Sequence, residues 1–231
     1  MTTAKLPPET AALWLQCKDE PLLAHSYLLG GTALALQIQH RISEDLDFFY
    51  ALPKLPCEDI AAFLEKLTSS GSALTMQTHW PTYDEFQIAG ENLYDHHQVW
   101  LVNAKTKISF TTFGAGTVKL LDTPASARNP VVPTVRELFA TKAVLVSQRN
   151  KTRDWLDLYI LLRAHHFTAA DFIAAYDKVG KPERGMAELK KLSTLSAPNK
   201  DEGYTALIMP PPTLEDMREF FAKLYADYQC R

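Results

Sequence analysis

One stretch decides the fold of this 231-residue chain: LLGGTALALQIQHRISEDLDFF, residues 28–49. It begins with an apolar run that ends at the pair Gly30–Gly31, and good helix formers follow as far as His40. This order predicts a strand, a tight turn and a helix. The short, aromatic-rich segment Leu46–Tyr50 then predicts a second strand, with acidic residues immediately before it.

Two aspartates, Asp45 and Asp47, stand at the start of this second strand. Side chains two residues apart on a strand project from the same face, so both carboxylates are expected to point the same way. Proteins hold Mg²⁺ with one or two carboxylates together with substrate phosphates. The pair is therefore suited to metal ions that bridge a triphosphate and an attacking oxygen. The alternative is a pair of solvated acids beside a turn.

The turn before the helix has the composition of a phosphate site. Gly30, Gly31 and Thr32 stand where the first strand ends and the helix begins. Glycine lets the backbone approach a phosphate closely, and a helix N-terminus offers N–H groups and the positive end of its dipole. Arg41 and Ser43 would add a phosphate contact and a hydroxyl. The alternative is a turn that merely needs a positive φ, which accounts for one glycine better than for two.

The remaining pattern divides the chain into two parts. Residues 58–67 have the spacing of an amphipathic helix, and residues 74–113 have a β texture with a hairpin turn at 103–106. Prolines then mark a connector, and the pattern beyond it is helical. The helices expected there run from Thr134 to about Gln148, over Asp154–Arg163, from Thr168, and over Leu214–Tyr228. We predict an α/β domain over residues 1–125 and a helical domain over residues 126–231 that completes the active-site cleft.

Charge and composition limit the classes of function. The net charge of −3 argues against a protein that coats nucleic acid with its whole surface. Residues 1–100 carry 5 Lys and Arg against 13 Asp and Glu, whereas residues 101–163 carry 10 against 4. The basic segment is suited to gripping phosphates. No segment reads as membrane-spanning, no secretion signal is evident, and three scattered cysteines fit no disulfide framework, so we expect a cytoplasmic protein.

Two separated motifs resemble a known family. The residues LLGGTALAL (28–36) and HRISEDLDFF (40–49) closely resemble the first motif of the AbiEii-type nucleotidyltransferases, a Gly-Gly or Gly-Ser turn followed by Asp-x-Asp. Lys142 within LFATKA (138–143) and the segment RNKTRDWLDL (149–158) resemble that family's later motifs. These proteins are toxins of type IV toxin–antitoxin and abortive-infection systems, within the DNA polymerase β-like superfamily. The resemblance implies an α+β fold, a mixed sheet with flanking helices followed by a helical C-terminal region.

The resemblance also implies roles for residues. Asp45 and Asp47 would hold Mg²⁺, and Gly30, Gly31 and Thr32 would cradle the triphosphate of an NTP. Lys142 would neutralise phosphate charge, and Asp154 would be the later essential acid. The spacing of Lys142 and Arg149 predicts that they share one face of a helix, although a solvated basic face is the alternative. Asp157 shares a face with Asp154, and we favour Asp154 as the functional acid.

One departure from the superfamily concerns a third carboxylate. Polymerase β-like enzymes commonly place one on a neighbouring strand, for which the natural place here is Lys107–Phe110. This chain offers Ser109 there and no acid. Related proteins often lack this acid too, so two-metal chemistry is less firmly indicated than nucleotidyl transfer itself.

The resemblance implies a Mg²⁺-dependent transferase that moves a nucleoside monophosphate from an NTP to an acceptor hydroxyl. The acceptor in such proteins is RNA, notably a tRNA 3′ end, and a cognate antitoxin is encoded nearby. Two alternatives stay open. In the first, the chain is a nucleotidyltransferase whose acceptor is a small molecule or a protein side chain. In the second, it binds NTP or a partner without turnover.

Overall fold

The computed structural model describes residues 5–112, 115–124, 130–147, 149, 151–194 and 202–230. The chain divides into two compact units. Unit 1 comprises Met1–Gly114 and Thr123–Pro133, and unit 2 comprises Ala115–Asp122 and Thr134–Arg231. The predicted domain boundary at residues 125 and 126 lies outside the described residues. Within the described part of the chain, no helix is long and apolar enough to cross a bilayer.

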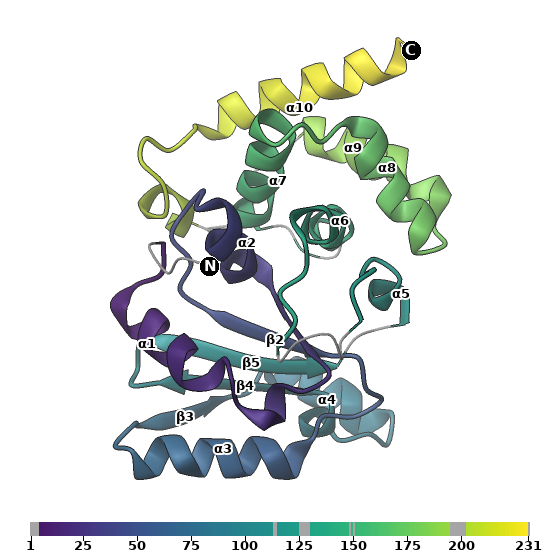
Figure 1. Cartoon of the computed structure of the whole chain (residues 1–231). Coiled ribbons are helices and arrows are strands. Elements are labelled where there is room, and N and C mark those ends of the chain that lie inside the picture. The colour runs from purple at the N-terminus through teal and green to yellow at the C-terminus, as the bar shows by residue number, and fades with distance from the viewer. Residues whose placement is uncertain are drawn as a thin grey trace. The chain divides into compact units, whose positions relative to one another are not determined.

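Unit 1 is built on a five-stranded sheet with strand order β1-β2-β5-β4-β3 (Figure 1). The strands are β1 (Ser26–Leu29), β2 (Leu46–Tyr50), β3 (Leu74–Gln77), β4 (His97–Val102) and β5 (Thr106–Thr112). The pair β2 and β5 is parallel, whereas the other neighbouring strands are antiparallel. A mixed sheet with flanking helices confirms the predicted α+β class.

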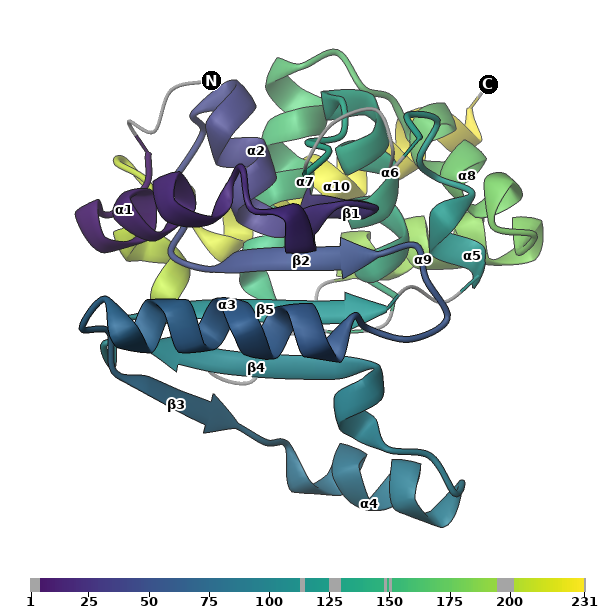
Figure 2. The same ribbon diagram turned by 60° about the horizontal axis from the view of Figure 1, so that its bottom comes forward.

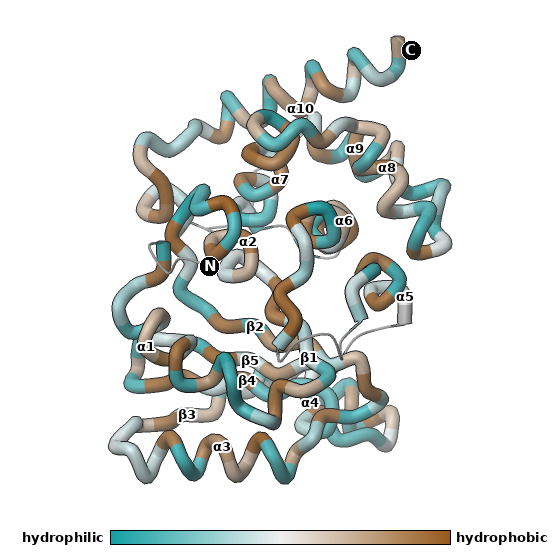
Figure 3. The backbone as a smooth tube through the Cα atoms, viewed as in Figure 1, coloured by the Kyte–Doolittle hydropathy of each residue, from teal (hydrophilic) through white to brown (hydrophobic). Residues whose placement is uncertain are grey.

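Unit 1 also contains helices outside this sheet. They are α1 (Pro8–Cys17), the 3₁₀ turn η1 (Pro21–Leu23), α2 (Gly30–Ile38), α3 (Cys57–Ser69), α4 (Trp80–Ile88) and the 3₁₀ turn η2 (Leu93–Asp95). The amphipathic helix predicted at residues 58–67 is confirmed as α3, whose apolar and polar residues alternate along its length (Figure 3). It lies along one face of the sheet (Figure 2).

Strand alternation separates the core face of the sheet from the face that carries the acids. Along β2 the buried positions alternate with half-buried ones. Phe48 stacks on Phe110 of β5, with ring centroids 5.9 Å apart. Gln98 of β4 pairs in register with Phe110, and its side-chain amide donates to the sulfur of Cys57 at the start of α3. Phe48 therefore faces α3, and Asp47 projects from the opposite face.

The predicted β texture over residues 74–113 is partly wrong. The hairpin is confirmed, and Asn103 and Ala104 have φ values of 52° and 55°, as a tight hairpin turn requires. Between β3 and β4, however, the chain forms α4 and η2. Sequence periodicity missed α4 because this helix does not bury an apolar stripe: Trp80 is 64% exposed and Ile88 is 88% exposed. Phe113 lies outside the described residues.

Unit 2 is helical in its described residues. Its elements are α5 (Ala115–Val118), α6 (Val135–Leu145), α7 (Thr152–Ala164), α8 (Ala169–Lys178), α9 (Pro182–Thr194), the 3₁₀ turn η4 (Glu202–Ala206) and α10 (Leu214–Gln229). Capping boxes at Thr134, Thr168 and Thr213 begin α6, α8 and α10, as their sequences predict. The apolar core of the unit includes Phe172 of α8, Leu189 of α9 and others.

Candidate active site

Gly30 brings the backbone of the β1–α2 turn against the carboxylate of Asp47. Its φ is +73°, a left-handed value that glycine adopts at little cost. A Cβ atom at this position would lie 2.7 Å from Oδ2 of Asp47. Glycine therefore suits this position for two reasons: it adopts the left-handed φ, and it lets the backbone approach the Asp47 carboxylate closely. The N-terminus of α2 and the Asp47 carboxylate lie side by side in unit 1.

The next glycine provides room for two polar side chains. A Cβ atom on Gly31 would collide with the guanidinium of Arg41 and lie 2.8 Å from the hydroxyl of Ser43. Both side chains are buried, and the Thr32 hydroxyl contacts Ser43 at 3.0 Å and also donates to the carbonyl of Asp45. The predicted phosphate-contact residues thus gather around the start of α2, where the first helical N–H groups have no intrahelical acceptor.

The parallel strand β5 supplies a partner for each of the two aspartates. Asp47 pairs in register with Ser109, and the Ser109 hydroxyl donates to Asp47 Oδ1 at 2.6 Å. Two residues earlier on β5, Lys107 Nζ lies 2.9 Å from Asp45 Oδ2. Asp45 itself immediately precedes β2 and is not part of it. Ser109, on the strand where the sequence offers no third acid, therefore binds Asp47 directly.

A histidine lies on the same face of the sheet. His97 of β4 pairs in register with Thr111, two residues beyond Ser109, and its Nδ1 lies 2.7 Å from the Thr111 hydroxyl. Burial lowers the pKa of His97, while the negative charge of Asp47 opposes that shift. The imidazole is consequently held in its neutral form at neutral pH.

The residues around Asp47 fit a divalent cation in their donor chemistry. Asp45 and Asp47 offer carboxylate oxygens, the ligands that Mg²⁺ prefers. Ser109 engages one oxygen of Asp47, and Oδ2 faces the N-terminus of α2, where a bound phosphate would bring further oxygen ligands. Among the described residues, no group of three or more His, Cys, Asp or Glu side chains forms a metal site. An ion here would rely on substrate and water for its remaining ligands.

A second cluster of charges is buried in unit 2. The ammonium of Lys142 lies 2.8 Å from Asp154 Oδ1 and 2.7 Å from Asp157 Oδ2. Arg149 donates to both oxygens of Asp154, from Nε at 2.8 Å and from Nη2 at 3.1 Å. Lys142 is 3% exposed, and both aspartates are 1% exposed or less. Each buried charge of this Lys142 cluster thus has an opposite charge in contact.

The cluster changes the acidity of Asp154. Burial alone would raise its pKa, but the charges and hydrogen bonds of Lys142 and Arg149 outweigh burial and hold the pKa of Asp154 below its usual value. The carboxyl is therefore ionised at neutral pH. It has the character of a fixed anion rather than of a proton donor.

One prediction about this cluster is wrong. Lys142 and Arg149 do not share a helix, because α6 ends at Leu145, short of the predicted end near Gln148. Gln148 itself lies outside the described residues. Arg149 reaches Asp154 from the segment that leads into α7, so the two cations meet through a common carboxylate and not along one helical face.

The structure thus gathers the predicted site residues in two groups. The first is in unit 1: Gly30, Gly31, Thr32, Arg41, Ser43, Asp45 and Asp47. The second is in unit 2: Lys142, Arg149 and Asp154. The sequence did not lead us to expect a contact for Lys107. A signal was present, because Lys107 and Ser109 are two residues apart on a strand and so share a face, by the same spacing that we used for Asp45 and Asp47.

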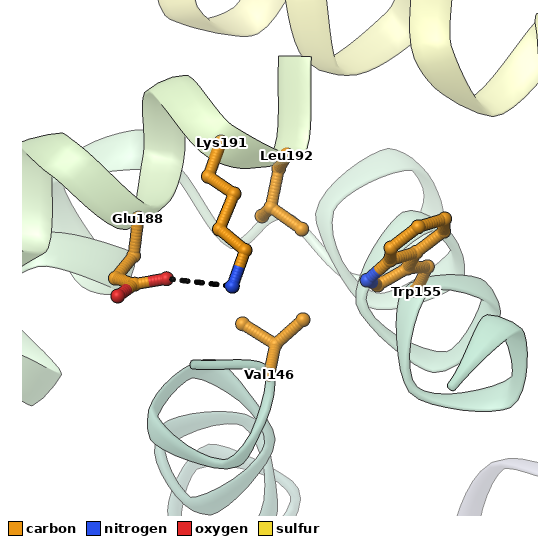
Figure 4. Close-up of a pocket in the computed structure, with 5 residues that line it drawn as sticks. All are labelled: Val146, Trp155, Glu188, Lys191 and Leu192. Carbon is orange, nitrogen blue, oxygen red and sulfur yellow. Dashed lines mark ion pairs between the residues drawn. The ribbon is translucent and has the colours of Figure 1, made fainter. Parts of the chain in front are cut away.

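Unit 2 also holds a small pocket that contains none of the predicted site residues (Figure 4). It is lined by Val146, Trp155, Glu188, Lys191 and Leu192. Across it, Lys191 Nζ lies 3.7 Å from Glu188 Oε2. Its remaining walls are apolar, so its lining lacks the multiple cationic donors that a triphosphate requires.

Comparison with known proteins gives a family match over most of the chain. The family model described as "Nucleotidyl transferase AbiEii toxin, Type IV TA system" matches residues 15–226. An uncharacterized protein of Aquifex aeolicus (strain VF5) is 24% identical over 212 residues, which cover 87% of this chain and 87% of that protein.

Comparison with solved structures finds matches from two other bacteria. JHP933 from Helicobacter pylori is 16% identical, with a TM-score of 0.49, over 96% of this chain and 93% of its own. MenT4, the nucleotidyltransferase toxin Rv2826c from Mycobacterium tuberculosis H37Rv, is 16% identical, with a TM-score of 0.49, over 96% of this chain and 82% of its own.

Proposed function

Because the chain belongs to the AbiEii family, the nucleotidyltransferase toxins of type IV toxin–antitoxin systems, we propose that it transfers a nucleoside monophosphate from an NTP to a hydroxyl of RNA, at a tRNA 3′ end, with Mg²⁺. Family membership itself makes the chain a nucleotidyltransferase with a nucleotide substrate and an antitoxin partner. The cation, the RNA acceptor and the residue roles are the proposal. We expect the antitoxin to be encoded nearby.

The observation that carries the proposal is the contact between the start of α2 and the Asp47 carboxylate. The helix N-terminus at Gly30 and Gly31 offers N–H donors and positive potential to the phosphates of an NTP. The Asp47 carboxylate, next to Gly30, offers oxygens to a cation on those same phosphates. A phosphate site and a cation site in such proximity are what phosphoryl transfer requires.

In this proposal the residues of unit 1 bind and orient the NTP. Asp45 and Asp47 would hold Mg²⁺, which would supply positive charge to neutralise the negative charge that develops on the phosphates. Arg41 and Ser43, buried around the first turn of α2, hold that turn in place and present donors to the triphosphate. Positioning and charge neutralisation supply most of the catalysis in reactions of this kind.

The residues of unit 2 are proposed to act in the same reaction. Lys142 contacts Asp154 and Asp157 through its ammonium, and we assign it the neutralisation of phosphate charge that the resemblance implies. Asp154 is the later essential acid of the family pattern. Since Lys142 and Arg149 keep it ionised, we assign it an orienting or charge-balancing role toward the acceptor hydroxyl or the metal site.

Two features support RNA as the acceptor. Residues 101–163 carry 10 Lys and Arg against 4 Asp and Glu, a balance suited to a polyanionic backbone. The second is the resemblance described above, which implies RNA as the acceptor of such growth-arresting toxins. A tRNA 3′ end offers a terminal hydroxyl that is accessible in a single-stranded segment.

Transfer of label from nucleotide to RNA tests the proposal. Purified protein is incubated with total tRNA, Mg²⁺ and each α-³²P-labelled NTP in turn, beside Asp47→Ala and the matched surface variant Asp84→Ala. We expect labelled tRNA with at least one NTP, loss of about 10²–10³-fold in Asp47→Ala, and no change in Asp84→Ala. Label on protein or on a small molecule would replace the RNA acceptor, and no label under any NTP would reject transferase activity in this assay.

A further inference from the structure

The parallel pairing of β2 with β5 gives each aspartate of the site a partner that is not an acid. Asp47 receives the Ser109 hydroxyl at 2.6 Å, and Asp45 receives the Lys107 ammonium at 2.9 Å. The strand register places Ser109 directly opposite Asp47, and Lys107 stands two residues earlier on the same strand face. β5 thus presents a hydroxyl and a cation where a third carboxylate would be expected.

We propose that the ammonium of Lys107 takes the place of one metal ion, so that of the two carboxylates assigned above to the metal only Asp47 binds a divalent cation, and the site holds a single one. The inference rests on the proposed function because it concerns the same carboxylates. It goes further by assigning the number of cations and by making Lys107 and Ser109 positioning residues of the site.

Charge balance is the first argument. Three carboxylates carry three negative charges, and two divalent cations on them leave a single positive charge. Asp45 and Asp47 carry two negative charges, whereas Lys107 and the nearby buried Arg41 carry two positive ones, so one divalent cation leaves two positive charges. A second divalent cation would leave four positive charges close together, which Coulomb repulsion disfavours.

The geometry of the two carboxylates is the second argument. The ammonium of Lys107 contacts Oδ2 of Asp45, and the Lys107 side chain is 34% exposed. A substrate can therefore reach the ion pair, whose lysine is fixed in position by strand β5. Ser109 occupies Oδ1 of Asp47, which leaves Oδ2 directed toward Gly30 and the start of α2. The two carboxylates are thus already differentiated: one pairs with a cation of the protein, and the other faces the phosphate turn.

Counting Mn²⁺ on the full-length protein tests this inference without any turnover. Mn²⁺ is added in steps, and electron paramagnetic resonance measures the ions that stay free, which gives the number bound per chain. Ions that the wild type binds and Asp47→Ala does not bind are assigned to the site. We expect one such ion in the wild type. Lys107→Met removes the positive charge beside Asp45 and should tighten Mn²⁺ binding by roughly tenfold. The matched control, Lys105→Met, removes an exposed charge of the same hairpin that pairs with Glu9, and should change nothing.

Two further readouts separate this role from a merely structural one. Ser109→Asp restores the third carboxylate and should add a second Mn²⁺ to the site. Lys107→Met should bind Mn²⁺ more tightly and yet transfer label more slowly, a combination that general misfolding does not produce. Two Asp47-dependent ions in the wild type, no such ion at all, or equal Mn²⁺ affinities in Lys107→Met and Lys105→Met would overturn the inference. A failure to label tRNA with these binding results intact would reject the proposed acceptor alone.

Discussion

Removal of the Lys142 charge should strongly destabilise unit 2. In Lys142→Met the side chain keeps most of its volume, but Asp154 and Asp157 remain buried at 1% and 0% exposure without the ammonium that contacts both. Breaking a buried ion pair by removing one partner costs about 3–5 kcal/mol in the free energy of unfolding. With an m value of about 2 kcal/mol/M, the urea midpoint should fall by about 1.5–2.5 M.

A second substitution tests whether charge balance is the cause. Asp157→Asn in the Lys142→Met background removes the surplus negative charge and leaves Asp154 with Arg149. It should recover about 1–3 kcal/mol, since contacting groups couple by that amount. The assay is urea unfolding of the full chain, followed by helical circular dichroism at pH 7.

The control is Lys178→Met, because Lys178 pairs with Asp122 at 3.3 Å on the surface of the same unit. Exposed pairs contribute about 0–1 kcal/mol. If Lys142→Met shifts the midpoint no more than Lys178→Met does, the charge balance of the Lys142 cluster does not hold unit 2 together. If the double variant is less stable than Lys142→Met, the cost lies in packing and not in charge.

Two further predictions concern backbone and pH. Gly30→Ala places alanine in a left-handed conformation, which costs about 1–2 kcal/mol, and its Cβ would lie 2.7 Å from Asp47 Oδ2. Stability should therefore fall modestly, whereas Mn²⁺ binding and label transfer should each fall more than tenfold. Gly71→Ala is the control for backbone strain alone, because its Cβ would meet open space at a φ of +95°. Because the pKa of Asp154 is lowered in the folded chain, its ionised form stabilises the fold above the unfolded pKa of about 4 and loses this effect as pH falls through the lower folded value. The difference in urea midpoint between wild type and Asp154→Asn should therefore be constant from about pH 5 to 7 and shrink below pH 4, and a difference that grows on acidification would contradict the assigned shift.

The parts of the fold that depend on local sequence could be predicted. The strand, turn, helix and second strand over residues 28–49 follow from periodicity and glycine placement, and the structure has β1, α2 and β2 there. Three helix starts follow from capping residues, because in each a threonine and an acid three residues later accept hydrogen bonds from one another's backbone N–H groups.

The parts that depend on distant residues could not be predicted. The end of α6 at Leu145 has no signal, because the residues from Ala143 to Val146 are all apolar and no glycine or proline follows at once. The missed α4 shows the opposite case, a helix without a buried stripe. The partners of Asp45 and Asp47 required the register of β5 against β2, and that register is set by the whole sheet rather than by either strand alone.

The parallel pairing of β2 with β5 also governs when the site comes into being during synthesis. Asp47 and Ser109 are 62 residues apart in sequence, and the residues of α3, β3, α4 and β4 are synthesised between them. A ribosome at about 5–20 residues per second therefore releases the aspartates several seconds before their strand partner. Nascent and prematurely terminated chains that end before β5 contain the Asp-x-Asp motif but not its partners. Full assembly of a toxin's site is thereby tied to translation well beyond its most recognisable motif.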